Sequence, residues 1–155
     1  MSVFSEYQTD TIDLALDFYG YEDCPKNYEF GPSVRDNFVL HFVTKGKGVF
    51  HFEKKEIHLE AGDLFLLPKN KVTYYQADAE EPWSYYWIGI SGTKVSDFMR
   101  FSTLHAKGYL KKTEVDTERI GLFMEQLVHK AEASKMTSHY QLHLLSQIYE
   151  LLFLI

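Results

Sequence analysis

Short hydrophobic stretches separated by turn residues run from about Asn27 to Ile90. In the stretch 49–53, hydrophobic and polar positions alternate, so Phe50 and Phe52 share one face of an extended segment. A fully hydrophobic stretch at 64–67 is closed by Pro68, which follows a turn at 61–63. Strands of this length and spacing predict an antiparallel β-barrel or sandwich.

The period changes after Gly92, where hydrophobic residues recur at three and four positions, as on one face of a helix. A short helix is expected from Val95, and longer helices after Thr113 and Ser138, each of which begins a capping pattern. The fold class is therefore α+β, mainly β, with two or three C-terminal helices. The chain ends in five hydrophobic residues, 151–155, and we expect it to be a fragment of a longer protein.

The first 26 residues alternate hydrophobic and acidic positions between Asp10 and Tyr19, which indicates an extended segment that ends at Gly20 and Pro25. We interpret residues 1–26 as an N-terminal arm with an edge strand. Residues 27–92 are then the barrel, and residues 93–155 are a helical segment.

Composition narrows the function of these 155 residues. Their formal net charge of −6 argues against a surface that grips nucleic acid phosphates. A single cysteine, Cys24, excludes an internal disulfide and fits the cytoplasm. The sequence shows no secretory signal and no membrane-spanning stretch. Aromatic residues reach 16%, which is enough to line a site for a ring-shaped ligand as well as to fill a core.

Three segments carry a family resemblance: Phe38–Phe52, Leu59–Pro68 with its Gly62-Asp63 turn, and Trp83–Ile90 with Trp83, Tyr85 and Trp87. Together they resemble the N-terminal cupin domain of AraC-type transcription regulators. The resemblance implies a cupin-like antiparallel β-barrel that binds a sugar or a similar small effector, and helices that form a homodimer. DNA binding would belong to a C-terminal pair of helix-turn-helix units that this sequence does not include.

The ligand-binding candidates come from both arguments. Strand alternation puts Tyr85 and Trp87 on one face, and His41 interrupts a hydrophobic strand on the face of Val39 and Val43, where it could point into the barrel. In the family, the residue similar to Trp87 stacks against the sugar. The resemblance also implies ligand contacts for Tyr75, for Tyr85 in place of a histidine, and for Arg35. The alternative is that these rings only fill the barrel.

No metal and no cofactor is expected. The ligand positions of metal-binding cupins fall near Pro32, Val34, Val39 and Thr73, which are not metal ligands of the needed kind. His139 and His143 share a helix face but have no third ligand placed by the sequence, and Cys24 is expected to be a plain thiol.

Three functions compete. The first is the effector-sensing and dimerisation domain of a carbohydrate-responsive bacterial regulator, not an enzyme. The second is a metal-independent cupin enzyme, such as a sugar isomerase or epimerase, and the third is a pure dimerisation module. The hydrophobic stripe of the last helix is expected to form the dimer interface. Its members are Leu144, Leu145, Ile148, Leu151 and Leu152.

Overall fold

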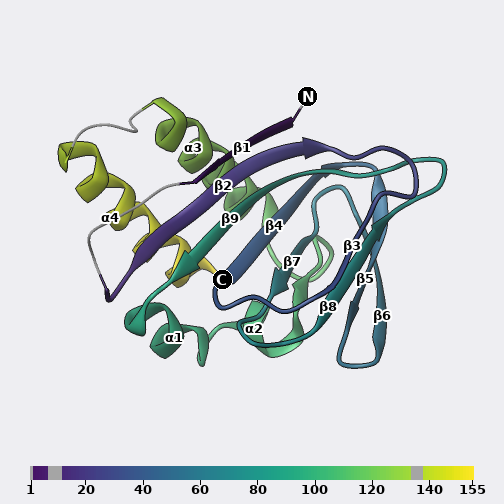
Figure 1. The fold of residues 1–155 in the computed structure, drawn as a ribbon, viewed down its shortest axis with the longest axis horizontal. Coiled ribbons are helices and arrows are strands. Elements are labelled where there is room, and N and C mark those ends of the chain that lie inside the picture. Colours follow the sequence, from purple (N-terminus) through teal and green to yellow (C-terminus); the bar gives the residue numbers. More distant parts are fainter. Residues whose placement is uncertain (1, 7–11, 134–137) are drawn as a thin grey trace.

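A computed structural model describes residues 2–6, 12–133 and 138–155, and Figure 1 shows two antiparallel sheets with helices on one side. The six-stranded sheet has the order β1-β2-β9-β4-β7-β10, and the four-stranded sheet has the order β3-β8-β5-β6. The strands are β1 (Ser2–Glu6), β2 (Ala15–Asp23), β3 (Glu29–Ser33), β4 (Phe38–Lys45), β5 (Lys47–Phe52), β6 (Lys55–Glu60), β7 (Leu64–Leu67), β8 (Thr73–Ala77), β9 (Ser84–Ser91) and β10 (Tyr109–Leu110). The helices are α1 (Thr93–Met99), α2 (Thr103–Lys107), α3 (Thr117–Ala133) and α4 (Ser138–Leu154).

The larger sheet separates two hydrophobic cores. Along β9 the alternation predicted from the sequence holds: Tyr85 faces the other sheet, whereas Ile88 and Ile90 face the helices. Phe50, on β5, closes the inner core from the smaller sheet. The prediction of a mainly β protein with a cupin-like barrel is confirmed.

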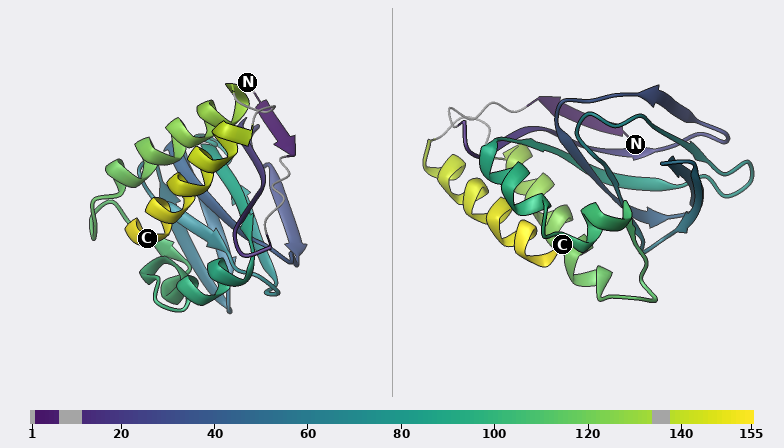
Figure 2. Two further views of the ribbon diagram at one scale, coloured as in Figure 1. Left: turned by 90° about the vertical axis from the view of Figure 1, so that its left-hand side faces the viewer. Right: turned by 90° about the horizontal axis from the view of Figure 1, so that it is seen from below.

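Helices α3 and α4 lie side by side across the outer face of the larger sheet (Figure 2). They bury their hydrophobic stripes there, with Met124 and Leu127 from α3 and Ile148 from α4 fully enclosed. The predicted short helix is α1, but α2 was not predicted, because five residues are too few to show a helical period. No helix in the described ranges is long and hydrophobic enough to cross a membrane.

Three local predictions need correction. The extended segment was expected to end at Gly20, but strand β2 continues through Gly20 and ends at Asp23. The sequence predicts a hairpin tip at Lys54 and Lys55, but the β5–β6 hairpin turns one residue earlier, at Glu53 and Lys54, which have φ values of 50° and 64°. Helix α3 begins after Asp116, whose carboxylate accepts a hydrogen bond from the Arg119 amide at 3.4 Å, so Asp116 replaces Thr113 as the cap. Part of the expected extended segment, residues 7–11, lies outside the described part of the chain. The side chain of Ser138, which was expected to cap a helix, also lies outside it.

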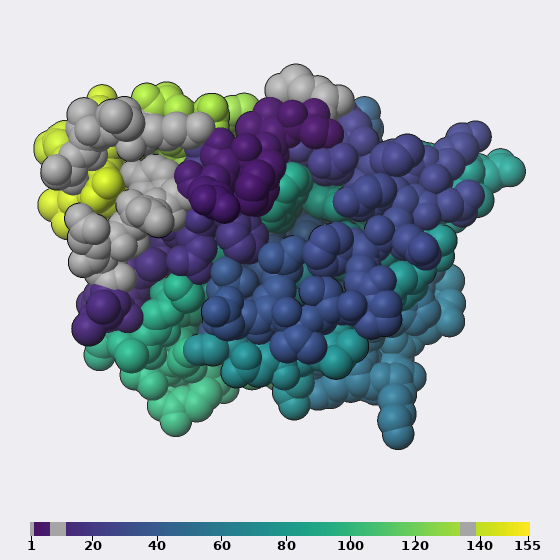
Figure 3. Space-filling view, in the orientation of Figure 1, coloured from purple at the N-terminus to yellow at the C-terminus, as the bar shows by residue number. Residues whose placement is uncertain are grey.

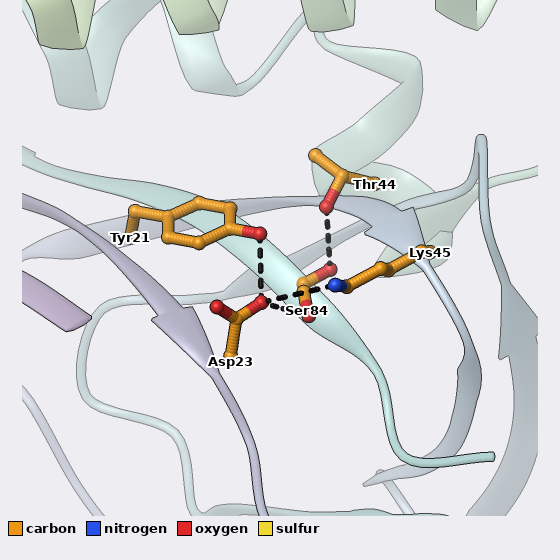
Figure 4. Close-up of polar contacts among 5 residues, drawn as sticks. All are labelled: Tyr21, Asp23, Thr44, Lys45 and Ser84. Carbon is orange, nitrogen blue, oxygen red and sulfur yellow. Dashed lines mark hydrogen bonds and ion pairs between the residues drawn. The ribbon is translucent and has the colours of Figure 1, made fainter. Parts of the chain in front are cut away.

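A polar cluster joins the ends of β2, β4 and β9 (Figure 4). The Asp23 carboxylate accepts hydrogen bonds from the Tyr21 hydroxyl at 2.8 Å and the Ser84 hydroxyl at 2.6 Å, and Lys45 lies 3.5 Å away. The Thr44 hydroxyl donates to the Ser84 carbonyl at 3.2 Å. These bonds tie together three strands of the larger sheet next to Tyr85.

Candidate functional site

Several separate cavities of about 400 to 550 Å³ open on the surface. One of them, of about 490 Å³, reaches into the barrel between the two sheets. All five predicted ligand-binding residues line it, although they come from β4, β8, β9 and the segment before β4. The described residues that line it are Phe4, Glu6, Phe18, Glu22, Tyr28, Phe30, Arg35, Val39, His41, Leu67, Tyr75, Tyr85 and Trp87. A volume of this size is typical of small-molecule sites.

The inner end of the cavity is aromatic. His41 pairs with Trp87 in the β4–β9 ladder, and the two rings lie 6.4 Å apart at an angle of 20°. The ring of Tyr85 stands edge-on to His41 at 4.9 Å, and the ring of Tyr75 approaches from the smaller sheet at 5.3 Å. Side chains from both sheets therefore converge on one pocket wall, which a single strand pattern could not show.

Glycine makes room for two of the rings that line the cavity. Gly20 on β2 pairs with Trp87 on β9, and a Cβ atom at Gly20 would lie 2.5 Å from Cη2 of the indole. The same strand pair places Gly89 beneath Phe18, where a Cβ atom would again lie closer than 3.0 Å to the ring. Glycine inside a strand often marks such a close approach. The positions of Trp87 and Phe18 thus depend on two glycines that are not among the described lining residues.

Arg35 is held between two aromatic rings. Its guanidinium carbon lies 5.6 Å from the centre of the Phe18 ring and 5.0 Å from that of Phe30, within the range of cation–π attraction. Its Nε atom is buried and has no hydrogen-bond partner in the described structure. Because a buried donor without a partner is costly, Arg35 is a donor available to a polar ligand.

His41 is the second polar group with an unused atom. The side chain is buried, and its Nδ1 has no hydrogen-bond partner among the described residues. Burial, with a smaller contribution from the Arg35 charge, lowers the pKa of His41 to about 3. The ring is therefore neutral at pH 7, when an imidazole carries one donor and one acceptor.

The hydroxyl and thiol groups at this end also stay protonated. Burial raises the pKa values of Tyr75 and Tyr85 above the ordinary phenol value. Burial likewise raises the pKa of Cys24 to about 11, which agrees with the expected plain thiol. Apart from Arg35, the deep wall thus offers uncharged polar groups.

Sequence reasoning missed the residues contributed by the N-terminal segment. Phe4 and Glu6 come from β1, and Phe18 and Glu22 come from β2, so the site extends outside the barrel expected at 27–92. β1 pairs with β2 along all five of its residues, and Figure 3 shows it in dark purple on the face turned to the viewer. The sequence alternation, which put Leu16 and Phe18 on one face, was wrong here, because a register shift between them in the β2–β9 ladder sends Leu16 to the core under the helices and Phe18 to the inner core.

Within the described ranges, no three His, Cys, Asp or Glu residues gather as a metal-binding group. Val39 and Thr73, at two of the positions where metal-binding cupins place ligands, are a cavity wall residue and a buried strand residue. His139 and His143 lie exposed on α4.

The five residues expected at a dimer interface divide into two groups. Leu144, Ile148 and Leu151 are buried within the chain, where they join the core beneath α3 and α4. Leu145 and Leu152 are only partly buried. A second copy placed on α4 would therefore contact Leu145 and Leu152 and not the three core residues.

Residues 15–152 match a family described as the AraC-like ligand-binding domain. The chain belongs to this family. It is 37% identical over 152 residues to the Msm operon regulatory protein of Streptococcus mutans serotype c, covering 98% of this chain and 54% of that protein. It is 41% identical over 100 residues to the raffinose operon transcriptional regulatory protein RafR of Pediococcus pentosaceus, and the match covers 63% of this chain and 36% of that protein.

A third relative of this AraC-like domain is the lactose operon transcription activator of Staphylococcus xylosus, with 31% identity over 119 residues, covering 76% of this chain and 43% of that protein. The chain thus spans about half the length, or less, of these curated relatives. The resemblance on Phe38–Phe52, Leu59–Pro68 and Trp83–Ile90 is confirmed, and the relatives are regulators of transcription.

Proposed function

We propose that this AraC-like domain senses a mono- or oligosaccharide for a bacterial transcription regulator and binds it in the barrel cavity. One observation carries the proposal. The cavity combines an aromatic wall with two buried polar atoms, Nε of Arg35 and Nδ1 of His41, that have no partner in the described structure. Two relatives regulate operons named for the sugars raffinose and lactose, which supports this class of effector.

A sugar satisfies both kinds of surface at once. The C–H face of a pyranose ring is hydrophobic and stacks on an indole, so Trp87 is the platform we assign to it. Its hydroxyl groups are donors and acceptors, which suit the neutral His41 ring and the Arg35 guanidinium. The same hydroxyls reach the Tyr75 and Tyr85 phenols, which remain protonated.

The position of β1 supports a role for the N-terminal arm in the response. Phe4 stacks on Trp87 with ring centres 6.3 Å apart and an angle of 18° between planes, so the arm contacts the ligand platform directly. Ser5 donates a hydrogen bond to Glu132 of α3 at 3.4 Å, and Tyr19 donates to the same carboxylate at 2.5 Å. A sugar that binds one arm position better than another would shift the population of arm positions.

The remaining partners follow from the same proposal. A second copy would meet the exposed side of α4, where Leu142 and Phe153 are 70% and 80% exposed. DNA contacts would belong to a part of the protein beyond these residues, since the chain carries a net charge of −6. We place the protein in the cytoplasm, where transcription regulators act.

Two alternatives make different predictions. A cupin enzyme acting on a sugar would convert it, and a pure dimerisation module would bind none. The regulatory names of the relatives favour a sensor over an enzyme. The partnerless polar atoms of the cavity favour a ligand over a filled barrel.

Sugar binding is tested by tryptophan fluorescence and thermal shift with raffinose, lactose and their component monosaccharides. The chain has two tryptophans, and Trp83 is fully buried and does not line the cavity, so Trp83→Phe leaves Trp87 as the only reporter. Quenching should persist in Trp83→Phe and disappear in Trp87→Ala. A sugar at 100 times its dissociation constant should stabilise the protein by about 2.7 kcal/mol.

Binding that survives unchanged in Trp87→Ala would move the site elsewhere. No response to any sugar would favour the dimerisation module, and turnover of a sugar would favour the enzyme.

A further inference from the structure

The outer part of the cavity carries more negative than positive charge. Glu6, from β1, and Glu22, from β2, both line it, whereas Arg35 is the only lysine or arginine among the described residues of the lining. His41 adds no charge, because burial lowers its pKa to about 3. With two carboxylates against one guanidinium, the formal charge of the lining is about −1 at pH 7.

Arg35 forms no direct ion pair with either carboxylate. Among the described residues it forms no salt bridge, and its guanidinium lies over the rings of Phe18 and Phe30 instead. Glu6 and Glu22 also have no salt bridge within the described part of the chain. A ligand in this cavity therefore lies near two carboxylates that have no ion-pair partner in the described part of the chain.

An anionic sugar fits this lining poorly. A phosphate ester carries about −1.5 to −2 charges near pH 7 and is normally held by several arginines, lysines or backbone amides. Here a single arginine would have to offset repulsion from two carboxylates. A neutral sugar has the opposite requirement, because its hydroxyl groups can donate to the Glu6 and Glu22 carboxylates and accept from Arg35.

We propose that the cavity selects an uncharged sugar and rejects its phosphorylated form, with Glu22 and Glu6 as the specificity-determining residues. This inference rests on the proposed function, since it names which sugars the same cavity accepts. It also places the effector in a reaction sequence. The sugar must arrive by uptake or glycoside cleavage that adds no phosphate, and it acts before any phosphoryl transfer to it.

Titration calorimetry on the 155-residue chain tests the selection with matched pairs. The pairs are galactose and galactose 6-phosphate, glucose and glucose 6-phosphate, and lactose and lactose 6-phosphate, with raffinose as a further neutral sugar. Where a neutral sugar binds, we expect its phosphorylated partner to bind about tenfold more weakly or worse, because like charges face each other. The gap should narrow as salt is raised from 50 to 500 mM, values that correspond to Debye lengths of roughly 14 and 4 Å.

Glu22→Gln and Glu6→Gln keep the shape and hydrogen-bonding capacity of the side chain and remove its charge. Each should reduce the preference for the neutral sugar at least about threefold, and the double variant should reduce it further. Glu118→Gln is the matched control, because Glu118 is exposed in the first turn of α3 and does not line the cavity. It should leave the preference unchanged.

The outcomes separate the two proposals. Neutral sugars that bind while phosphorylated ones fail, with the preference weakened in Glu22→Gln, support the inference. A phosphorylated sugar that binds as tightly as its neutral partner, or tighter, overturns the inference and leaves sugar sensing intact. A preference that stays at the wild-type value in both glutamine variants overturns the roles of the two carboxylates. If no neutral or phosphorylated sugar binds, the proposed function itself fails.

Discussion

Gly20→Ala adds one methyl group at the position where the arm, the β2 strand and the Trp87 indole meet. The new Cβ atom would lie 2.5 Å from Cη2 of Trp87 and closer than 3.0 Å to the carbonyl oxygen of Val3. Carbon atoms in contact are normally about 3.5 Å apart, so the indole must retreat by about 1 Å or β1 must move outward. The variant therefore perturbs the ligand platform and its covering strand without removing any side chain.

The cost can be estimated from two opposing effects. Overpacking a filled site costs about 1–3 kcal/mol. Replacing glycine by alanine lowers the entropy of the unfolded chain and offsets about 0.4–1 kcal/mol of this. A net loss of about 1–2 kcal/mol in the free energy of unfolding should lower the melting temperature by roughly 2–8 °C for a domain of this size.

The assay is a double-mutant cycle of Gly20→Ala with Trp87→Ala, followed by denaturant unfolding. When the indole is absent, the added methyl group gains space, so the cost of Gly20→Ala should fall and the remainder should report the contact with Val3. Raffinose or lactose binding to the Gly20→Ala single variant should weaken as well. Equal stability and unchanged sugar affinity in Gly20→Ala would refute the close approach on which this reasoning depends.

Two further predictions concern pH and assembly. The pKa of His41 falls from its ordinary value of 6.5 to about 3 on folding, so the unfolded chain binds the extra proton as the pH decreases from 6.5 toward 3. Stability should be lost over that window by up to about 1.4 kcal/mol per pH unit, and urea titrations of His41→Gln should lack this contribution while the exposed-site control His58→Gln retains it. For assembly, Leu145→Glu should yield a monomer in sedimentation analysis if two copies meet on α4. A dimer mass that is unchanged in this variant would place the interface elsewhere, and Glu118→Gln provides a charge control on the neighbouring helix.

The strand pattern predicted much of the barrel because the side-chain period of a strand is two. It placed His41, Tyr85 and Trp87 on inward faces, and the structure brings all three to one cavity. Arg35 lies in no periodic segment, so only the family resemblance pointed to it. The structure explains its place by the rings of Phe18 and Phe30 on either side.

The contribution of the N-terminal segment could not be read in the same way. Gly20 has the appearance of a strand breaker in one sequence, because the indole that it accommodates lies 67 positions later, at Trp87. The register that brings Gly20 opposite Trp87 is a long-range property of the β2–β9 ladder. For the same reason Glu6 and Glu22 were not recognised as part of the site.

The last helix shows a different limit. Its hydrophobic stripe indicates burial, but the pattern does not identify the surface that buries it. In the structure α3 and the larger sheet cover Leu144, Ile148 and Leu151, and Leu145 lies toward the edge of that contact. A stripe broad enough for two partners looks the same in sequence as one that a single partner covers.

The strand that reaches over the cavity occupies the outermost place in its sheet. β1 is held by one ladder, to β2, whereas β2, β9 and β4 are each held on both sides. Peeling β1 away would break five residue pairings and would leave both hydrophobic cores closed, since Phe4 is 60% exposed where it lies. Local unfolding of β1 therefore costs less than detaching any of the central strands, and the domain can open toward a ligand while its two cores stay packed.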